Sequence, residues 1–143
     1  MATPKWYANG LLNVATGAVS LDGDTIKLIL ITASYTPNQS TDTFRSDLGA
    51  NEATGATGYP AGGFTLATKT LTIVSALTIQ WDADDITQSI TGSLTFRYGV
   101  YYKSRGGASS ADELIGYVDF GSQTITSATL TITQADPLTI TAS

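Results

Sequence analysis

The side chains that most often perform chemistry are scarce in this 143-residue chain, which contains no histidine and no cysteine. Their absence excludes histidine-based catalytic triads, thiol nucleophiles, disulfides and histidine-bound metals. A pair of carboxylates could still act as in glycoside hydrolysis. However, the two glutamates, Glu52 and Glu113, fall in or beside predicted loops, and the aspartates gather at predicted turns, where Asp bonds its local backbone. We therefore expect no catalytic residues and no enzymatic activity.

Two aspartate-rich segments carry oxygen atoms that could bind calcium. They are Asp22–Asp24 and Asp82–Asp85. Neither has the spaced twelve-residue pattern of a calcium-binding loop, and turn hydrogen bonding accounts for both. We expect no metal ion and no cofactor, and we keep calcium at Asp82–Asp85 as the open alternative.

The elements that would position any site are short and rich in threonine. Apolar residues occupy every second position in four segments: Lys69–Val74, Ala76–Trp81, Ala128–Thr133 and Pro137–Ala142. This period is typical of a strand with one buried and one solvent-exposed face. The exposed faces would carry Thr instead of Lys or Glu, in keeping with a charged content of 13%, against about 25% in an ordinary domain. Such nearly uncharged faces are suited to lying against other protein.

Two further segments predict the centre of the fold. Leu94–Tyr102 is the strongest predicted strand, and Thr25–Thr32 is apolar on both faces from Leu28 to Ile31, which indicates a central strand covered on both sides. One face of the strongest strand would hold Leu94, Phe96, Tyr98, Val100 and Tyr102. Further strands are predicted at Gly63–Ala67 and Glu113–Phe120, and a short, weak one at Ile86–Ile90.

This pattern predicts an all-β fold, an antiparallel β-sandwich, jelly-roll-like, with a short N-terminal helix. We expect a single domain over residues 1–143, with an N-terminal helical arm at 1–17 and a long Gly-rich loop region at 34–63. The helix would open at Thr3–Pro4, place Tyr7, Leu11 and Val14 on one stripe, and end at Gly17.

Seven residues are candidates for an interface. Arg97, Tyr101 and Lys103 lie on the predicted solvent face of the strongest strand, where an aromatic ring between two cations could bind a sugar or a neighbouring subunit, or could simply face solvent. Trp6 lies off the helical stripe and is either a core residue or an anchor on a partner.

The other three candidates lie in the long loop. Tyr35, Phe44 and Tyr59 could anchor residues 34–63 on a neighbour, because long ordered loops are often functional. The alternative is that the loop folds back over one end of the sandwich and plugs it.

Charge and hydropathy exclude two classes of partner. The seven basic residues are scattered, so we expect no nucleic-acid binding. No apolar run approaches the length of a membrane-spanning helix, and the first residues lack the pattern of a signal peptide, so we expect no membrane association. A chain without cysteine fits synthesis in a reducing cytoplasm.

Eight segments, taken in order, resemble a family of small structural proteins of tailed bacteriophages, most closely the head decoration, or cement, proteins. They are Lys5–Leu12, Asp24–Thr32, Ser34–Gln39, Glu52–Gly55, Gly58–Gly63, Asp82–Thr87, Arg97–Lys103 and Leu114–Gly121. The resemblance covers most of the chain up to about Gly121 and brings no catalytic residues with it.

The resemblance implies a non-enzymatic virion protein, made in the host cytoplasm and placed on the capsid exterior. Such a protein decorates and stabilises the capsid through contacts with the major capsid protein and with copies of itself, which the resemblance implies form a homotrimer. The alternative is a tail or fibre-associated β-sandwich that binds a host-surface glycan through the strand Arg97–Lys103 and the Gly-rich loop.

Overall fold

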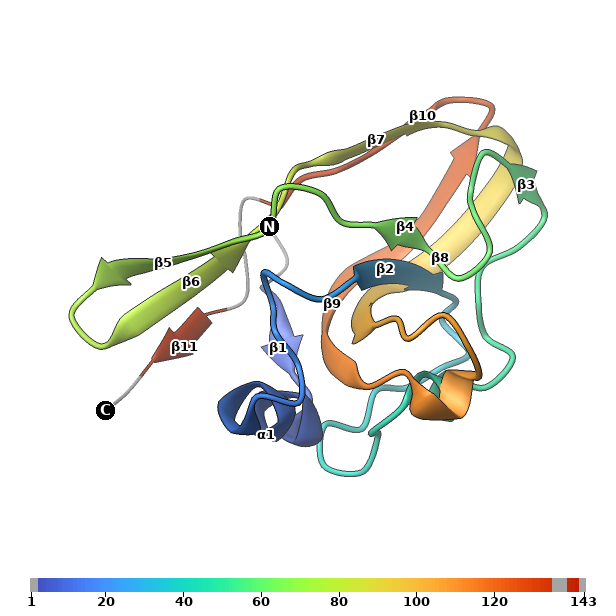
Figure 1. Ribbon diagram of the computed structural model, residues 1–143. Helices are drawn as coiled ribbons and strands as arrows, with labels where there is room; N and C mark the ends of the chain where they lie inside the picture. The colour runs from blue at the N-terminus through green and yellow to red at the C-terminus, as the bar shows by residue number, and fades with distance from the viewer. Residues whose placement is uncertain (1–2, 135–138, 142–143) are drawn as a thin grey trace.

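The computed structural model describes residues 3–134 and 139–141, and these residues are mostly β, with 46% strand and 12% helix (Figure 1). All of the strand pairings between described residues are antiparallel. The predicted all-β antiparallel sandwich with a short N-terminal helix is confirmed. No helix in the described part of the chain is long and apolar enough to cross a membrane.

The elements follow one another in short steps. In chain order they are β1 Lys5–Trp6, α1 Ala8–Thr16, β2 Ile26–Ile31, a 3-10 helix Arg45–Leu48, β3 Ala56–Thr57, β4 Phe64–Thr65, β5 Thr70–Ser75, β6 Thr78–Asp82, β7 Ile86–Ser89, β8 Thr91–Lys103, a 3-10 helix Ser109–Ala111, β9 Leu114–Thr126, β10 Thr129–Ile132 and β11 Thr139–Thr141. The predicted strand at Pro137–Ala142 lies partly outside the described residues, and β11 is its described portion.

The main sheet is built on the two long strands β8 and β9. Its order is β1-β9-β8-β2-β4, and β3 pairs with the start of β8. The last residue pair between β8 and β9 is Ser93 with Thr126. A few residues beyond it on both sides, β7 and β10 begin to pair at Ser89 with Thr129. β7 and β10 therefore extend the β8–β9 ribbon and bend back across the sheet, as Figure 1 shows. The bent ribbon encloses one of the two core clusters.

The strand β2 separates these two clusters. Its residues Leu28 and Leu30 belong to the cluster beneath β10, whereas Ile29 and Ile31 belong to the cluster that includes Tyr7. All four side chains are buried. The prediction of a central strand covered on both faces is confirmed.

The N-terminal helix begins later than predicted. Instead of opening a helix at Thr3–Pro4, the chain pairs Lys5 and Trp6 with β9, and α1 starts afterwards. The helix ends at Gly17 as predicted, with a φ of 82° that glycine adopts without strain. The predicted stripe is wrong at Leu11, which is exposed, because the helix buries Gly10 against β9.

The face assignment in the strongest strand is also corrected. The predicted apolar row is divided between the two core clusters. One cluster contains Leu94 and Phe96, and the other contains Tyr98, Val100 and Tyr102. The register with β9 shifts between Phe96 and Tyr98, because β9 contains extra residues there. A shift of this kind bends and twists the strand, so its alternation does not keep one face throughout.

Candidate interaction surface

A small sheet projects from the body of the molecule. It contains β5, β6 and β11, with β6 in the centre, and Figure 1 shows it extending away from the main sheet. We call these three strands the arm. Within the described residues, the outer edges of β5 and β11 have no strand partner.

One side of the arm is apolar. The register places Leu71 opposite Trp81, and Ile73 and Ile140 on either side of Ile79, so these side chains share a face. Leu77 in the turn joins Ile73, Ile79 and Ile140 around a shallow hollow of about 210 Å³. We call this surface, made of Leu71, Ile73, Leu77, Ile79 and Ile140, the arm face.

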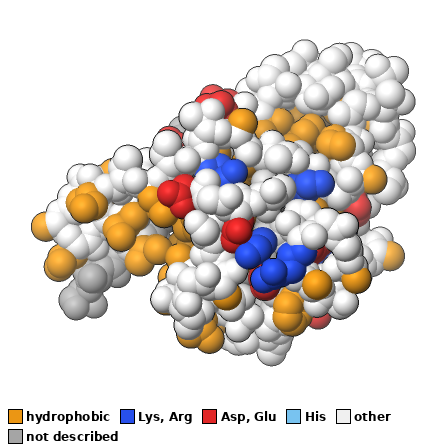
Figure 2. Space-filling model, in the orientation of Figure 1, with side chains coloured by type: hydrophobic (Ala, Val, Ile, Leu, Met, Phe, Trp, Pro, Cys, Tyr) orange, Lys and Arg blue, Asp and Glu red, His pale blue; other side chains and the backbone are white. Residues whose placement is uncertain are grey.

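The arm face is exposed in the isolated chain. Ile73 is 81% exposed and Leu77 66% exposed, and Figure 2 shows hydrophobic side chains gathered over the arm. Every residue of β5 is exposed, which corrects the expectation that one of its faces is buried. The alternation detected an apolar face, but no other part of the described chain covers it.

The arm face carries no charge, and among the three strands of the arm only Asp82, at the base of β6, is acidic or basic. No Lys, Arg, Asp or Glu occurs between Thr70 and Trp81, and β11 contains only Thr and Ile. Burial of apolar side chains is therefore the main attraction that this surface offers to a partner.

Two tryptophans fasten the base of the arm to the body. Trp81 is buried, donates its indole N–H to the Leu21 carbonyl at 3.0 Å, and sets its ring edge-on to Tyr101 at 5.3 Å. Trp6 donates its indole N–H to the carbonyl of Thr139 in β11 at 2.8 Å and packs against the core. The structure thus places the interface candidate Trp6 at an internal contact with the arm.

The long loop at 34–63 folds back onto the body. Tyr35 is buried, and its hydroxyl donates to the Asp42 carboxylate at 2.6 Å and accepts from the Tyr7 hydroxyl at 2.7 Å. Burial raises the pKa of both tyrosines. The proposal that Tyr35 anchors the loop on a neighbour is corrected, because its ring is part of the core.

The other two loop candidates also contact their own chain. Tyr59 donates its hydroxyl to Glu52 at 3.0 Å, accepts the Leu30 N–H at 3.0 Å, and lies edge-on to Phe64. Phe44 is half-buried and its backbone bridges to Glu113. These contacts favour the alternative in which the loop plugs one end of the sandwich.

The predicted cation–aromatic surface on β8 does not form. Tyr101 is buried, and its hydroxyl donates to Gln134 at 2.7 Å. Arg97 makes two hydrogen bonds to Asp119, at 3.0 and 2.9 Å, and these lower the pKa of that carboxyl. Lys103 pairs with Asp24 at 2.8 Å. The assignment of Tyr101 to a surface is therefore corrected, and both cations are held by carboxylates of the same chain.

The aspartates at 82–85 bond to nearby backbone and hydroxyl groups. Asp84 accepts from the Thr68 hydroxyl at 2.7 Å, and Asp85 accepts the Gln134 N–H at 2.8 Å. Asp82 accepts the N–H of the next residue. Among the described residues, no three acidic, histidine or cysteine side chains gather where they could hold a metal ion. Calcium at this turn has no support in the described geometry.

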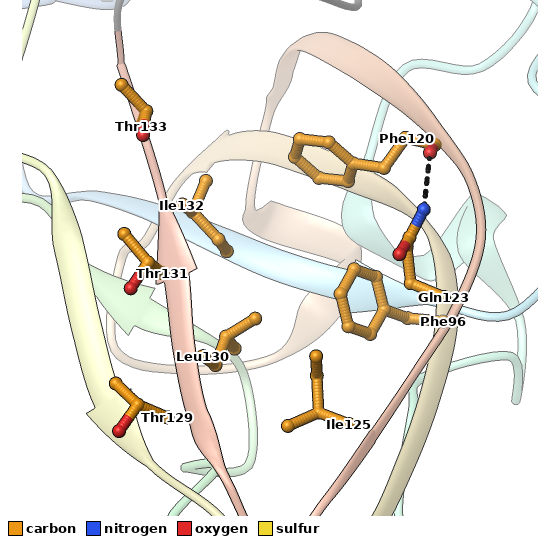
Figure 3. Close-up of a pocket in the computed structure, with 9 residues that line it drawn as sticks. All are labelled: Phe96, Phe120, Gln123, Ile125, Thr129, Leu130, Thr131, Ile132 and Thr133. Atoms are coloured by element: carbon orange, nitrogen blue, oxygen red, sulfur yellow. Dashed lines mark hydrogen bonds between the residues drawn. The ribbon is translucent and has the colours of Figure 1, made fainter.

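A second uncharged surface lies inside the bend of the ribbon. A hollow of about 470 Å³ lies between β10 and the β8–β9 pair, and Figure 3 shows the side chains that line it. Phe96, Phe120 and Ile125 line one side and Leu130 and Ile132 the other, with threonines of β10 at the rim. Gln123 spans the β9 bulge and donates to the Phe120 carbonyl at 3.0 Å. The lining contains no titratable side chain, so the hollow offers shape and apolar contact but no acid–base chemistry.

The arm face is the surface that the sequence reasoning missed. The alternation predicts its strands but also predicts that their apolar side is buried in the core. Two signals were present in the sequence: the absence of charge between Thr70 and Trp81, and a connection of only Ala76 and Leu77 between two strands. Together they indicate a tight hairpin with an uncharged face, although neither says whether the rest of the chain covers it.

Comparisons with protein-family models, with curated proteins and with solved structures each found no match to this chain.

Proposed function

We propose that this protein is a non-enzymatic structural subunit that works by binding other proteins, and that it decorates and stabilises the capsid of a tailed phage. The observation that carries the binding role is the arm face, an exposed and uncharged apolar surface on a projecting sheet. Exposed apolar patches on soluble proteins commonly mark interaction sites. The capsid setting is supported by the resemblance of eight ordered segments to phage structural proteins.

The charged groups give further support to a structural role. Four ion pairs join described residues: Arg45–Asp112, Arg97–Asp119, Lys103–Asp24 and Arg105–Glu113. Side chains paired within the chain hold loops and strands together and are less available for a substrate. On a capsid, many copies add weak contacts into firm attachment without any strong single site.

The glycan-binding alternative has less support. It depended on a tyrosine between two exposed cations, but Tyr101 is buried and both Arg97 and Lys103 are engaged by acidic side chains. The Gly-rich loop is likewise occupied with internal contacts through Tyr59 and Glu52. No other described feature of the molecule favours sugar binding.

A co-sedimentation experiment tests the proposal. The purified chain is mixed with capsids of its parent phage from which the chain is missing, and in parallel with glycans of the host surface. We expect the chain to pellet with the capsids, to saturate at a fixed number of copies per capsid, and to raise the temperature at which the capsids rupture. A chain that binds the glycans and leaves the capsids bare would refute the proposal.

A further inference from the structure

We propose that the arm face binds the arm face of a second copy of this chain, so that the two arms form the two layers of a small β-sandwich. The inference rests on the proposed function only in treating the arm as a protein-binding surface. Its partner is another copy, whatever larger structure the protein joins.

The arm has the construction of half a sandwich. One side carries the apolar arm face, and the other carries polar side chains such as Thr72 and Gln80. A three-stranded sheet with one apolar side needs a second layer over that side to be stable in water. The body of the chain supplies cover only at the base, where Trp81 is buried, and leaves Ile73 and Leu77 exposed. The missing layer must therefore come from outside the described chain.

A second copy fits this vacancy for chemical reasons. A partner with charged side chains would lose their hydration against the arm face and gain no opposite charge in return. Another arm face has the same uncharged chemistry. In a two-fold contact, the same apolar side chains of both copies are covered at once, so a single surface supplies both sides of the interface. The row Leu71, Ile73 and Ile79 would then face its own counterpart, as the inner faces of a sandwich do.

The turn at the tip of the arm supports the contact between two arm faces. Leu77 has a φ of 68°, a left-handed conformation that Gly or Asn adopts with less strain, and its side chain is 66% exposed. A strained turn that displays a large apolar side chain is understandable if that side chain is buried in the assembled protein.

Site-directed cross-linking tests the contact directly, because the chain has no native cysteine. Ile79→Cys places a thiol on the arm face in the central strand, and Gln80→Cys places one on the opposite side of the same strand. Since packed sheets lie about 10 Å apart, a bismaleimide of that span is used instead of direct oxidation. We expect Ile79→Cys to give cross-linked dimer at least about tenfold faster than Gln80→Cys. Equal rates would overturn the inference.

Sedimentation of charge variants provides the second measurement. Ile73→Asp puts a carboxylate on the arm face, whereas Thr72→Asp puts it on the reverse side of the same strand. We expect the wild type and Thr72→Asp to associate, and Ile73→Asp to associate at least about tenfold more weakly, because a buried unpaired charge is strongly unfavourable. Both sites are exposed in the isolated chain, so circular dichroism should report the same fold for all three. A monomeric wild type, or equal association of both variants, would overturn the inference.

Three further outcomes separate the arm-to-arm contact from the alternatives and from the proposed function. If Ile79→Cys chains cross-link to Ile125→Cys chains but not to each other, the arm binds the hollow beside β10 and the arm-to-arm contact is wrong. If the chain dimerises through the arm but does not bind capsids, the contact stands and the proposed function fails. If it binds capsids as a monomer, the proposed function stands and the contact fails.

Discussion

Replacing Gly10 by alanine sets two measurable effects against each other. In an exposed helix this change would stabilise the protein by about 1 kcal/mol, because glycine is a poor helix former. At Gly10, however, an added Cβ would lie 2.3 Å from the carbonyl oxygen of Ile115, 2.7 Å from that of Leu114 and 2.8 Å from the Ile115 Cα. All three are backbone atoms of β9, so no side-chain rotation can relieve the contact.

The helix must therefore move away from β9 by about 1 Å to restore an ordinary van der Waals distance. Overpacking costs about 1–3 kcal/mol, and a clash with backbone atoms that cannot rotate away lies in the upper part of that range, at about 2–3 kcal/mol. After the gain in helix propensity, we expect Gly10→Ala to lower the free energy of unfolding by about 1–2 kcal/mol. For a domain of this length the midpoint of thermal unfolding should fall by roughly 3–7 °C.

Urea unfolding followed by tryptophan fluorescence measures this change, because both Trp6 and Trp81 contact the core. The matched control is Ala15→Gly at an exposed position of the same helix, which should cost about 1 kcal/mol through propensity alone. If Gly10→Ala is as stable as the wild type or more so, the helix does not approach β9 as closely as described, and the reasoning is refuted.

Three other perturbations have defined outcomes. Phe96→Ala should lower the free energy of unfolding by about 3 kcal/mol, because the buried ring borders a hollow and packs edge-on to Phe120. The control Thr95→Ala, at an exposed position, should change the free energy of unfolding by less than about 0.5 kcal/mol. Equal losses of the two variants in urea unfolding would contradict the assignment of Phe96 to the core. Hydrogen bonds from the Phe44 and Thr43 N–H groups lower the pKa of Asp47, so its contribution to stability is present above the ordinary Asp pKa and is lost as pH falls through the lowered value. Asp47→Asn should therefore cost about 1 kcal/mol at pH 7 and almost nothing at pH 2, and a constant difference across that range would argue against the assignment. EDTA should leave the melting temperature unchanged, and a fall of more than about 5 °C would point to a bound metal ion.

Strand positions were predictable from alternation, whereas burial was not. β5 and β10 contain the same tetrapeptide, Thr-Leu-Thr-Ile, at residues 70–73 and 129–132. Leu130 and Ile132 are buried, but Leu71 is 40% and Ile73 81% exposed. Identical local sequences thus have opposite environments, because burial depends on which distant segment covers the strand. The arm face could not be identified from these residues alone.

The prediction that Tyr101 of β8 faces solvent is wrong for a related reason. The alternation that begins at Leu94 predicts a solvent-facing Tyr101. The two register shifts in β9 and the cover provided by Trp81 and Gln134 bury it instead. Neither effect can be predicted from the residues of β8 alone, because both depend on other segments of the chain. The central position of β2 was predictable because an apolar run on both faces permits few other placements.

The bent ribbon also has a consequence for how the chain reaches its native state. The residue pair nearest the β8–β9 connection is Tyr102 with Leu114. Once this pair has formed, each further pair toward Ser89 and Thr129 closes a loop that is only a few residues longer than the one before. β2 meets β8 only after the whole intervening chain is brought together. Closing a loop between residues far apart in the sequence costs more entropy and slows folding. We therefore expect β8 and β9 to pair first near their connection, pairing to proceed from there toward β7 and β10, and β2 to join the sheet later. Pulsed hydrogen exchange during refolding should then protect the β8 amides that bond to β9 before those of β2.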